Sequence, residues 1–500
     1  MGARRRRPPR SPARGRIPRA FRRQKLPPGR AVTLRERVAG AAVAAARPLL
    51  PLLGLRSRRL ARAVAERKGV AGRLAAWASE GRDPGRPVVW LHGASAGELA
   101  GAAPTVERLR ERRDVQLVAS YFSPSAEDAL PLLEPDAAEP LPTDALRPCR
   151  RALEAAGPDA VVFAKGDLWP NFTRAAAGLG IPLALVNGTV APDSSRLRGP
   201  ARWLLRPAHR RLARAGAASE ADARRLRQLG VRQEALAVTG DAAFDQALAR
   251  ARRAREDPDS PAARLRAMVA GDDVPVLVAG STWPPDEEAL ISAAAALAAE
   301  GRPLRLVLAP HEPTDAAVGR IARRCREALG RAPVVWSRAE EDGSRATRGG
   351  GPDGGGSGSD RESGAAGAPD PDAAPPLPRP VLVDVIGPLA ELYAAADLAW
   401  VGGGFGREGL HSVIEPAAAG VPVLFGPVST RREAEALRAA GGSRAVPEGE
   451  LAGALRELVD HPERRREMGE AARAAVEAEA GAAEASARLV EGLLDGAARG

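Results

Sequence analysis

Short apolar segments alternate with helical patterns along this chain, and the whole alternation occurs twice. In the first half the apolar segments are 87–93, 115–120, 159–164, 182–188, 215–219 and 236–241. In the second half they are 274–282, 304–312, 334–336, 380–385, 398–404 and 422–427. Strands of this length between helices predict parallel, doubly wound sheets. We therefore expect an α/β protein with two Rossmann-like domains facing a cleft, with ligands at the carboxyl ends of the strands.

Composition sets the predicted boundaries, and 500 residues are enough for two domains with separate cores. The two α/β domains are expected at 87–247 and 248–480, and the C-terminal helix at 481–500. Residues 31–86 are expected to be a helical, membrane-proximal segment. The stretch 339–378 is rich in Gly, Ser, Asp and Pro, so we predict a disordered insertion in the second domain.

The net charge of +12 arises in the first thirty residues, which contain eleven Arg, one Lys and no acidic residue. We expect this basic tail, 1–30, to be disordered. The rest of the chain is close to neutral and has no overall bias toward polyanions. A nucleic-acid-binding protein is a third, weaker interpretation, because the tail lacks interleaved aromatic residues apart from Phe21 and no recognised binding module follows it.

Residues 38–55 are apolar but interrupted by one arginine and two prolines, which makes them a poor spanning helix. A basic tail followed by such a segment can lie on an anionic membrane surface. A disordered start followed by a packed helix explains the same pattern, and both interpretations stay open. The two cysteines, Cys149 and Cys325, lack metal-ligand spacing, so we expect neither a disulfide framework nor a metal site.

Two acidic residues follow strands of the first predicted sheet. Glu98 ends the segment HGASAGE, in which Gly97 permits close backbone approach to a ligand. Asp167 lies in KGDLWPN, after the strand at 159–164. Each acid alone is explained by a helix N-terminus. Together, at two strand ends of one sheet, they are candidates for general-base chemistry.

The second half has three loops that could bind a ligand: GSTWPPDEE (280–288), APHEPTD (309–315) and a long segment at 402–427. The last begins with three glycines and continues to His411 and Glu415, which a helix would place on one face. Glycines give backbone access to a phosphate, and a helix N-terminus favours an anion. A Glu one turn later can accept hydrogen bonds from ribose hydroxyls. This combination is typical of the donor domain of GT-B transferases.

These blocks, taken in order, resemble the 3-deoxy-D-manno-octulosonic acid (Kdo) transferases of lipopolysaccharide synthesis. HGASAGE resembles the family's His-x-x-Ser-x-Gly-Glu loop, and DLWPN its Glu-Leu-Trp-Pro-Asn block. ASEADARRLRQLG (218–230) and VTGDAAFD (238–245) match signatures in the middle of the chain. GSTWPPDEE, APHE, and GGGFG with LHSVIEP complete the donor side in the form of a divergent branch.

The resemblance implies a metal-independent GT-B enzyme, without a cofactor, that transfers Kdo from CMP-Kdo to a lipid A precursor with inversion. It implies a location at the cytoplasmic face of the inner membrane and no nucleic-acid partner. Glu98 matches the family's catalytic base, and Asp167 is the second candidate catalytic residue. The candidate substrate and donor contacts are Ser95, Gly97, Ser281, Thr282, His311, Glu312, Gly387, Gly402, Gly403, Gly404, His411, Ser412 and Glu415.

Three positions differ from the family's pattern. Asp167 replaces a frequent Glu, Ser412 replaces a frequent Asn, and Ala243 stands where Arg or Lys is common. The third difference removes a possible anion contact. The alternative enzyme is a GT-B protein that uses a UDP-sugar, either a lipid-linked sugar transferase or an epimerase. Such a protein would share the Gly-rich donor segment but is not expected to contain HGASAGE together with DLWPN.

Overall fold

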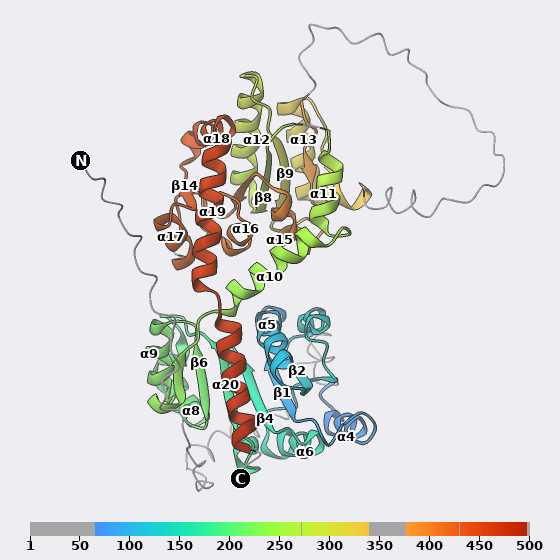
Figure 1. The fold of residues 1–500 in the computed structure, drawn as a ribbon, viewed down its shortest axis with the longest axis vertical. Coiled ribbons are helices and arrows are strands. Elements are labelled where there is room, and N and C mark those ends of the chain that lie inside the picture. The colour runs from blue at the N-terminus through green and yellow to red at the C-terminus, as the bar shows by residue number, and fades with distance from the viewer. Residues whose placement is uncertain (1–65, 272, 340–376, 430, 498–500) are drawn as a thin grey trace, which may run out of the picture. The chain divides into compact units, whose positions relative to one another are not determined.

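The computed structural model describes residues 66–271, 273–339, 377–429 and 431–497, which form two compact units (Figure 1). The first unit runs to Asp245 and resumes at Ala480, and the second comprises Gln246–Glu479. The basic tail, the apolar segment 38–55 and nearly all of the proposed insertion lie outside the described residues. Two parallel-sheet α/β domains, as the sequence predicts, are confirmed.

The first unit contains a seven-stranded parallel sheet of order β3-β2-β1-β4-β5-β6-β7. Its strands are β1 (Val88–Gly93), β2 (Gln116–Tyr121), β3 (Ala137–Pro140), β4 (Ala160–Ala164), β5 (Leu183–Gly188), β6 (Arg214–Ala217) and β7 (Leu236–Val238). Its helices are α4 (Val70–Glu80), α5 (Ala96–Arg112), α6 (Leu146–Ala156), α7 (Pro170–Gly178), α8 (Gly199–Arg210), α9 (Glu220–Leu229) and α20 (Ala482–Ala497).

Alternate residues of β1 enter different cores, which explains the continuous apolar run of this strand. Trp90 packs into the core covered by α4, α6 and α7. Val89 and Leu91 pack into the opposite core, which α5 and α20 cover. The strand is therefore buried on both faces, and its carboxyl end is the part that remains available for a site.

The second unit contains a seven-stranded parallel sheet of order β10-β11-β9-β8-β12-β13-β14. Its strands are β8 (Val276–Thr282), β9 (Arg305–Pro310), β10 (Val334–Val335), β11 (Val381–Leu382), β12 (Leu398–Val401), β13 (Val423–Phe425) and β14 (Ser443–Ala445). Its helices include α11 (Pro261–Val269), α12 (Pro284–Ala299), α13 (Asp315–Leu329), α15 (Leu389–Leu392), α16 (Ile414–Ala418), α17 (Arg432–Ala439), α18 (Leu451–Asp460) and α19 (Pro462–Glu479). Helix α10 (Ala242–Glu256) begins in the first unit and ends in the second.

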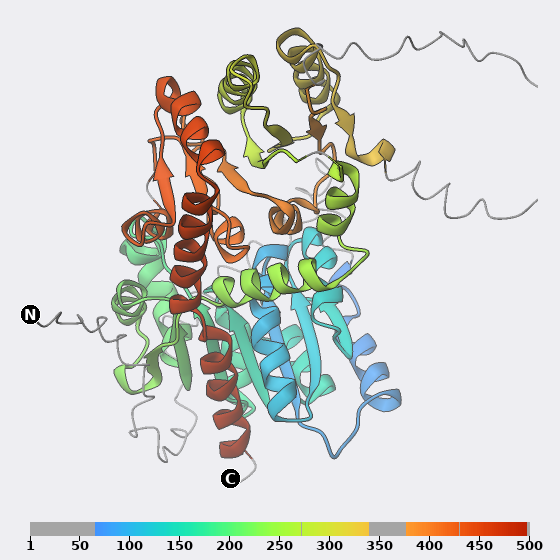
Figure 2. The ribbon, with the colours of Figure 1, turned by 45° about the horizontal axis from the view of Figure 1, so that its top comes forward.

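The edge strands β3 and β14 were not predicted. Their sequences, AAEP and SRA, lack the apolar run of the central strands, whereas the strands at the opposite edges, β7 and β10, keep the apolar sequences LAV and VV. Helix α20 returns to the first unit and lies along α5, as both views show (Figures 1 and 2). Arg112 reinforces this packing by pairing with Glu484 and Glu491 at 3.0 and 2.6 Å.

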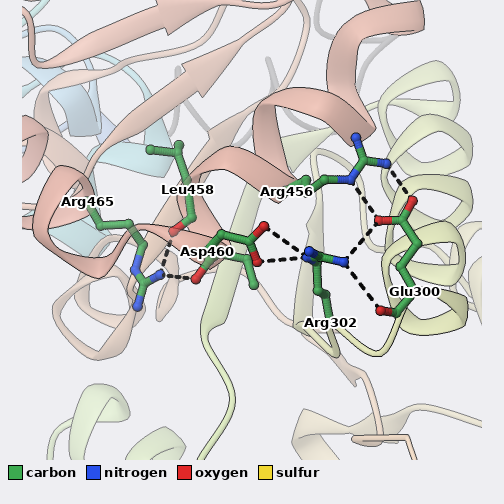
Figure 3. A network of polar contacts seen from close by, with 7 residues as sticks. Glu300, Arg302, Arg456, Leu458, Asp460 and Arg465 are labelled. Carbon is green, nitrogen blue, oxygen red and sulfur yellow. Dashed lines mark hydrogen bonds and ion pairs between the residues drawn. The ribbon is translucent and has the colours of Figure 1, made fainter.

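An ion-pair network joins the end of α12 to α18 (Figure 3). Glu300, the C-cap of α12, accepts a hydrogen bond from Arg456 at 2.7 Å. Arg302 donates to both carboxylate oxygens of Asp460 at 2.8 and 2.9 Å. Because these side chains are substantially exposed, each pair stabilises the fold by only about 0–1 kcal/mol. These ion pairs hold the C-terminal end of α12 against α18 at the amino edge of the sheet, where β9 begins.

Candidate functional site

Glu98 lies in the first turn of α5, directly after β1, and is half-buried. Its Oε2 atom accepts a hydrogen bond from the backbone N–H of Ala94 at 2.6 Å. Burial raises the pKa of Glu98, the Ala94 N–H opposes this, and the charge of Asp167 raises it further. The charges of Lys165 and Arg196 lower it by smaller amounts. The carboxylate therefore stabilises its own loop and is also made more basic, as a general base requires.

Asp167 follows β4, the strand next to β1 in the sheet. Its Oδ1 atom lies 3.3 Å from Nη1 of Arg196, and the same Nη1 donates to the carbonyl of Gly166 at 2.9 Å. The preceding Lys165 has a φ of 63°, in the left-handed region that non-glycine residues rarely adopt. Such strain concentrates at functional sites, and this loop is one candidate.

A buried histidine ties the two loops of the first unit together. His92 Nδ1 lies 3.0 Å from the Ser120 hydroxyl, and Trp169 donates its indole N–H to His92 Nε2 at 2.9 Å. Burial lowers the pKa of His92 to about 3, so the ring is neutral at physiological pH. The hydrogen bond between the Trp169 and His92 side chains thus links DLWPN to HGASAGE. Sequence reasoning placed both motifs but missed this role of His92 and Trp169.

Most second-unit candidates lie where neighbouring strands end. Ser281 and Thr282 end β8, His311 and Glu312 follow β9, and the three glycines follow β12. Backbone hydrogen bonds join these segments, since His311 N–H donates to Thr282 O at 3.0 Å and Gly402 N–H donates to Gly280 O at 2.9 Å. Ser281 has a φ of 52°, a second strained non-glycine position at a strand end.

His311 and His411 are stacked, with ring centroids 4.5 Å apart. The two belong to different loops, so the fold brings together side chains that are 100 positions apart in the sequence. Trp283, which sequence reasoning did not single out, stacks on His311 at 4.9 Å. An aromatic residue immediately after the Gly-Ser-Thr strand end was the available signal.

One prediction about this segment is wrong: His411 and Glu415 do not share a helix face. Helix α16 begins at Ile414, so His411 lies in the loop before it. Ser412 donates a hydrogen bond to the Glu415 carboxylate at 2.5 Å and interacts with the first helical N–H. Since α16 has only five residues, it is too short to supply the helix N-terminus expected to favour an anion.

The three glycines are required by the chain's own packing. A Cβ added to Gly402 would lie 2.2 Å from the carbonyl oxygen of Ser281, and one on Gly404 would lie 2.6 Å from the N of Gly426. Gly403 has a φ of 91°, where a side chain is strained. Close backbone packing is therefore sufficient to account for the GGG sequence, and the phosphate access expected for it stays a prediction.

Asp286 is a further residue that sequence reasoning missed. Its buried carboxylate accepts hydrogen bonds from the N–H of Trp283 and of Gly403, both at 3.0 Å, and from the Trp400 indole at 3.1 Å. Burial raises the pKa of Asp286, and these donors oppose the shift because they stabilise the charged form. One carboxylate thus holds the loop after β8 and the loop after β12 in register.

The side chains of the remaining candidates make no described contact with these clusters, although the Ser95 carbonyl accepts a hydrogen bond from the Glu98 N–H at 3.1 Å. Gly387 has a φ of 129° and open space where a Cβ would be. Gly97 likewise has open space, and Ser95 is the N-cap of α5 without a side-chain capping bond. Glu312 is exposed. Among the residues that the structure describes, no three His, Cys, Asp or Glu side chains are grouped to hold a metal ion.

Comparisons with known proteins agree with these motifs. Residues 62–246 match the sequence model of a family described as 3-deoxy-D-manno-octulosonic-acid transferase (kdotransferase). The chain is 31% identical over 425 residues to 3-deoxy-D-manno-octulosonic acid transferase of Bordetella pertussis, covering 81% of this chain and 87% of that one. It is 28% identical to the protein of the same name from Chlamydophila psittaci, covering 76% and 79%.

The fold is also similar to a solved structure, that of UDP-GlcNAc 2-epimerase from Neisseria meningitidis bound to UDP-GlcNAc. The TM-score is 0.53 at 16% identity, covering 82% of this chain and all of that one. This likeness concerns the fold, which is that of GT-B proteins.

Proposed function

The chain belongs to the 3-deoxy-D-manno-octulosonic acid transferase family, and from this we propose that it transfers Kdo from CMP-Kdo to a lipid A precursor in lipopolysaccharide synthesis. The observation that carries the proposal is the likeness to the Bordetella pertussis protein over four-fifths of the chain. The environment of Glu98 supports it, because a sugar hydroxyl attacks well only when a base takes its proton.

In the proposed reaction, the first unit supplies the base and the second unit holds the nucleotide. Glu98 takes the proton of the acceptor hydroxyl as its oxygen attacks the anomeric carbon of Kdo. The bond from that carbon to the CMP phosphate breaks, and CMP leaves, which inverts the configuration. Asp167 acts by positioning Glu98 or the acceptor, since Arg196 already neutralises part of its charge.

The proposed location is the cytoplasmic face of the inner membrane, where a lipid acceptor would be presented. In the described ranges, no helix is both long and apolar enough to cross a bilayer. The proposed location is argued from the lipid nature of the acceptor.

The nucleotide tests the proposed function against the UDP-sugar alternative. We expect CMP to bind the purified chain at least about tenfold more tightly than UDP, a difference of about 1.4 kcal/mol. Isothermal titration calorimetry with both nucleotides measures this ratio. Equal or tighter binding of UDP would favour a UDP-sugar enzyme.

Turnover is expected to be unchanged by EDTA, because backbone donors and neutral side chains can stabilise the leaving CMP without a metal. An assay of CMP release with CMP-Kdo and a lipid A precursor, with and without chelator, checks this. Loss of activity on chelation, restored by added magnesium, would contradict it.

A further inference from the structure

Three rings from three loops form a cluster at the carboxyl edge of the second sheet: Trp283 after β8, His311 after β9 and His411 after β12. The Trp283 indole N–H donates to Nε2 of His411 at 3.3 Å. His311 is stacked on Trp283 with an interplanar angle of 26° and on His411 with one of 29°. If His311 lay between the other two rings, their nitrogens could not meet. His311 therefore covers one face of an edge-joined Trp283–His411 pair.

This arrangement determines where the His411 proton is. An indole nitrogen is a donor only, so Nε2 of His411 must present its lone pair to Trp283. A neutral ring then carries its proton on Nδ1. Burial, together with the charges of His311 and Arg431, lowers the pKa of His411, which acts in the same direction.

Neighbouring residues occupy most of the remaining surface of the His411 ring. The Cδ2 atom faces Gly403, where an added Cβ would lie 3.4 Å away. Nε2 is occupied by Trp283, and one ring face is covered by His311. Within the described part of the chain, no hydrogen-bond partner is within range of Nδ1. The Nδ1–H group is therefore the polar atom of the ring that is left for a ligand.

We propose that Trp283 is a positioning residue that, with His311 stacked over it, fixes His411 as the Nδ1–H tautomer, so that His411 donates a neutral hydrogen bond to the phosphate of CMP. This step rests on the proposed function, in which the second unit holds the nucleotide. A neutral donor binds the phosphate without forming an ion pair that must be broken when CMP leaves. Two sources of anionic oxygen exist in a CMP-sugar, the phosphate and the sugar carboxylate, and the proposal commits to the phosphate.

The tautomer is tested directly on the unliganded wild-type chain by ¹⁵N NMR of its histidine rings. His411→Phe identifies the His411 signals by their disappearance. We expect the shifts of a neutral ring with a protonated Nδ1 and an unprotonated Nε2 at neutral pH. A protonated Nε2, or a charged ring, overturns the proposal whatever the chain binds.

The positioning role is tested with Trp283→Phe, which keeps an aromatic ring for His311 to stack on and removes the N–H donor. We expect the His411 signals to move toward the Nε2–H tautomer and CMP affinity to fall about tenfold, the scale of one hydrogen bond to a charged group. Cytidine, which lacks the phosphate, should bind both forms within about twofold of each other. Trp203→Phe, on α8 of the first unit, is the matched control and should change neither the His411 signals nor CMP binding.

Wild-type CMP affinity in Trp283→Phe, or an equal loss for cytidine and CMP, would overturn the positioning role or the assignment to the phosphate. If the wild-type chain binds no CMP, the proposed function fails and this ligand step fails with it. The NMR measurement still decides the tautomer in that case, so the two failures are distinguishable.

Discussion

Replacing Glu98 with glutamine is expected to lower turnover by at least about 10²-fold, while CMP affinity stays within a few-fold of the wild-type value. A positioned base contributes typically about 10²–10⁴-fold, and glutamine cannot accept the proton. CMP affinity is unaffected because the proposed nucleotide site lies in the other unit. Steady-state kinetics with CMP-Kdo and a lipid A precursor, together with calorimetry for CMP, measures both quantities.

The pH profile adds a second measurement on the same variant. The base acts only when ionised, so the wild-type rate should fall as pH drops through the pKa of Glu98. Burial places that pKa above its ordinary value of 4.5. In Glu98→Gln this acidic limb should be absent from the residual rate.

Two further variants serve as references for the loss of turnover expected in Glu98→Gln. Glu107→Gln, on an exposed turn of the same helix, should leave the rate unchanged. Asp167→Asn should reduce it less than Glu98→Gln, because its carboxylate already pairs with Arg196. If Glu98 only stabilises a helix N-terminus, worth about 0.3–1 kcal/mol, Glu98→Gln would be slightly less stable with a near-normal rate. That result would refute its role as the base.

Replacing Asp286 with alanine is expected to destabilise the second unit by about 3 kcal/mol and to weaken CMP binding. The change leaves three donors without their acceptor: the buried N–H of Gly403, the buried indole N–H of Trp400 and the partly buried N–H of Trp283. An unsatisfied buried group costs about 1–3 kcal/mol. At roughly 2–4 °C per kcal/mol for a unit of this size, the melting temperature of the second unit should fall by about 10 °C. Differential scanning calorimetry measures it.

Glu288→Ala is the matched control for Asp286, two positions along the same helix. Glu288 pairs with Arg324 at the surface, and its side chain is 55% exposed, so its loss should cost less than about 1 kcal/mol. Asp286→Asn, which keeps one acceptor oxygen, should lie between the two. Equal melting temperatures for Asp286→Ala and Glu288→Ala would show that Asp286 does not hold the two loops.

The central strands of both sheets could be predicted because each is a continuous apolar run, as in β1, where burial on both faces demands apolar residues throughout. The strands β3 and β14, each at one edge of its sheet, could not be predicted, because AAEP and SRA contain no apolar run. Glu98, Ser281 and His311 could be placed at strand ends because the strands that precede them could be predicted. The expectation of one helix face for His411 and Glu415 failed because i,i+4 spacing holds only inside a helix, and Gly409, at a φ of 83°, keeps the chain irregular before α16.

The contacts between loops could not be read from the sequence. Trp283, Asp286 and His92 lie in or beside recognised motifs, yet apart from the contact between Trp283 and Asp286 their partners are from 28 to 128 positions away. Local patterns report periodicity and turn chemistry, whereas these pairings depend on the order in which strands assemble into a sheet. The role of Asp286 in particular required knowing that β8 and β12 are neighbours.

The return of α20 to the first unit has a consequence for synthesis. Val490 and Leu494 of this helix complete the core that contains Val89 and Leu91, yet a ribosome makes them after the whole second unit. Chains emerge at about 5–20 residues per second, so the nascent first unit waits at least ten seconds or so for its last helix. When α20 begins to be made, the second unit already has every residue it needs. The usual order, in which the N-terminal domain is finished first, is therefore reversed in this chain.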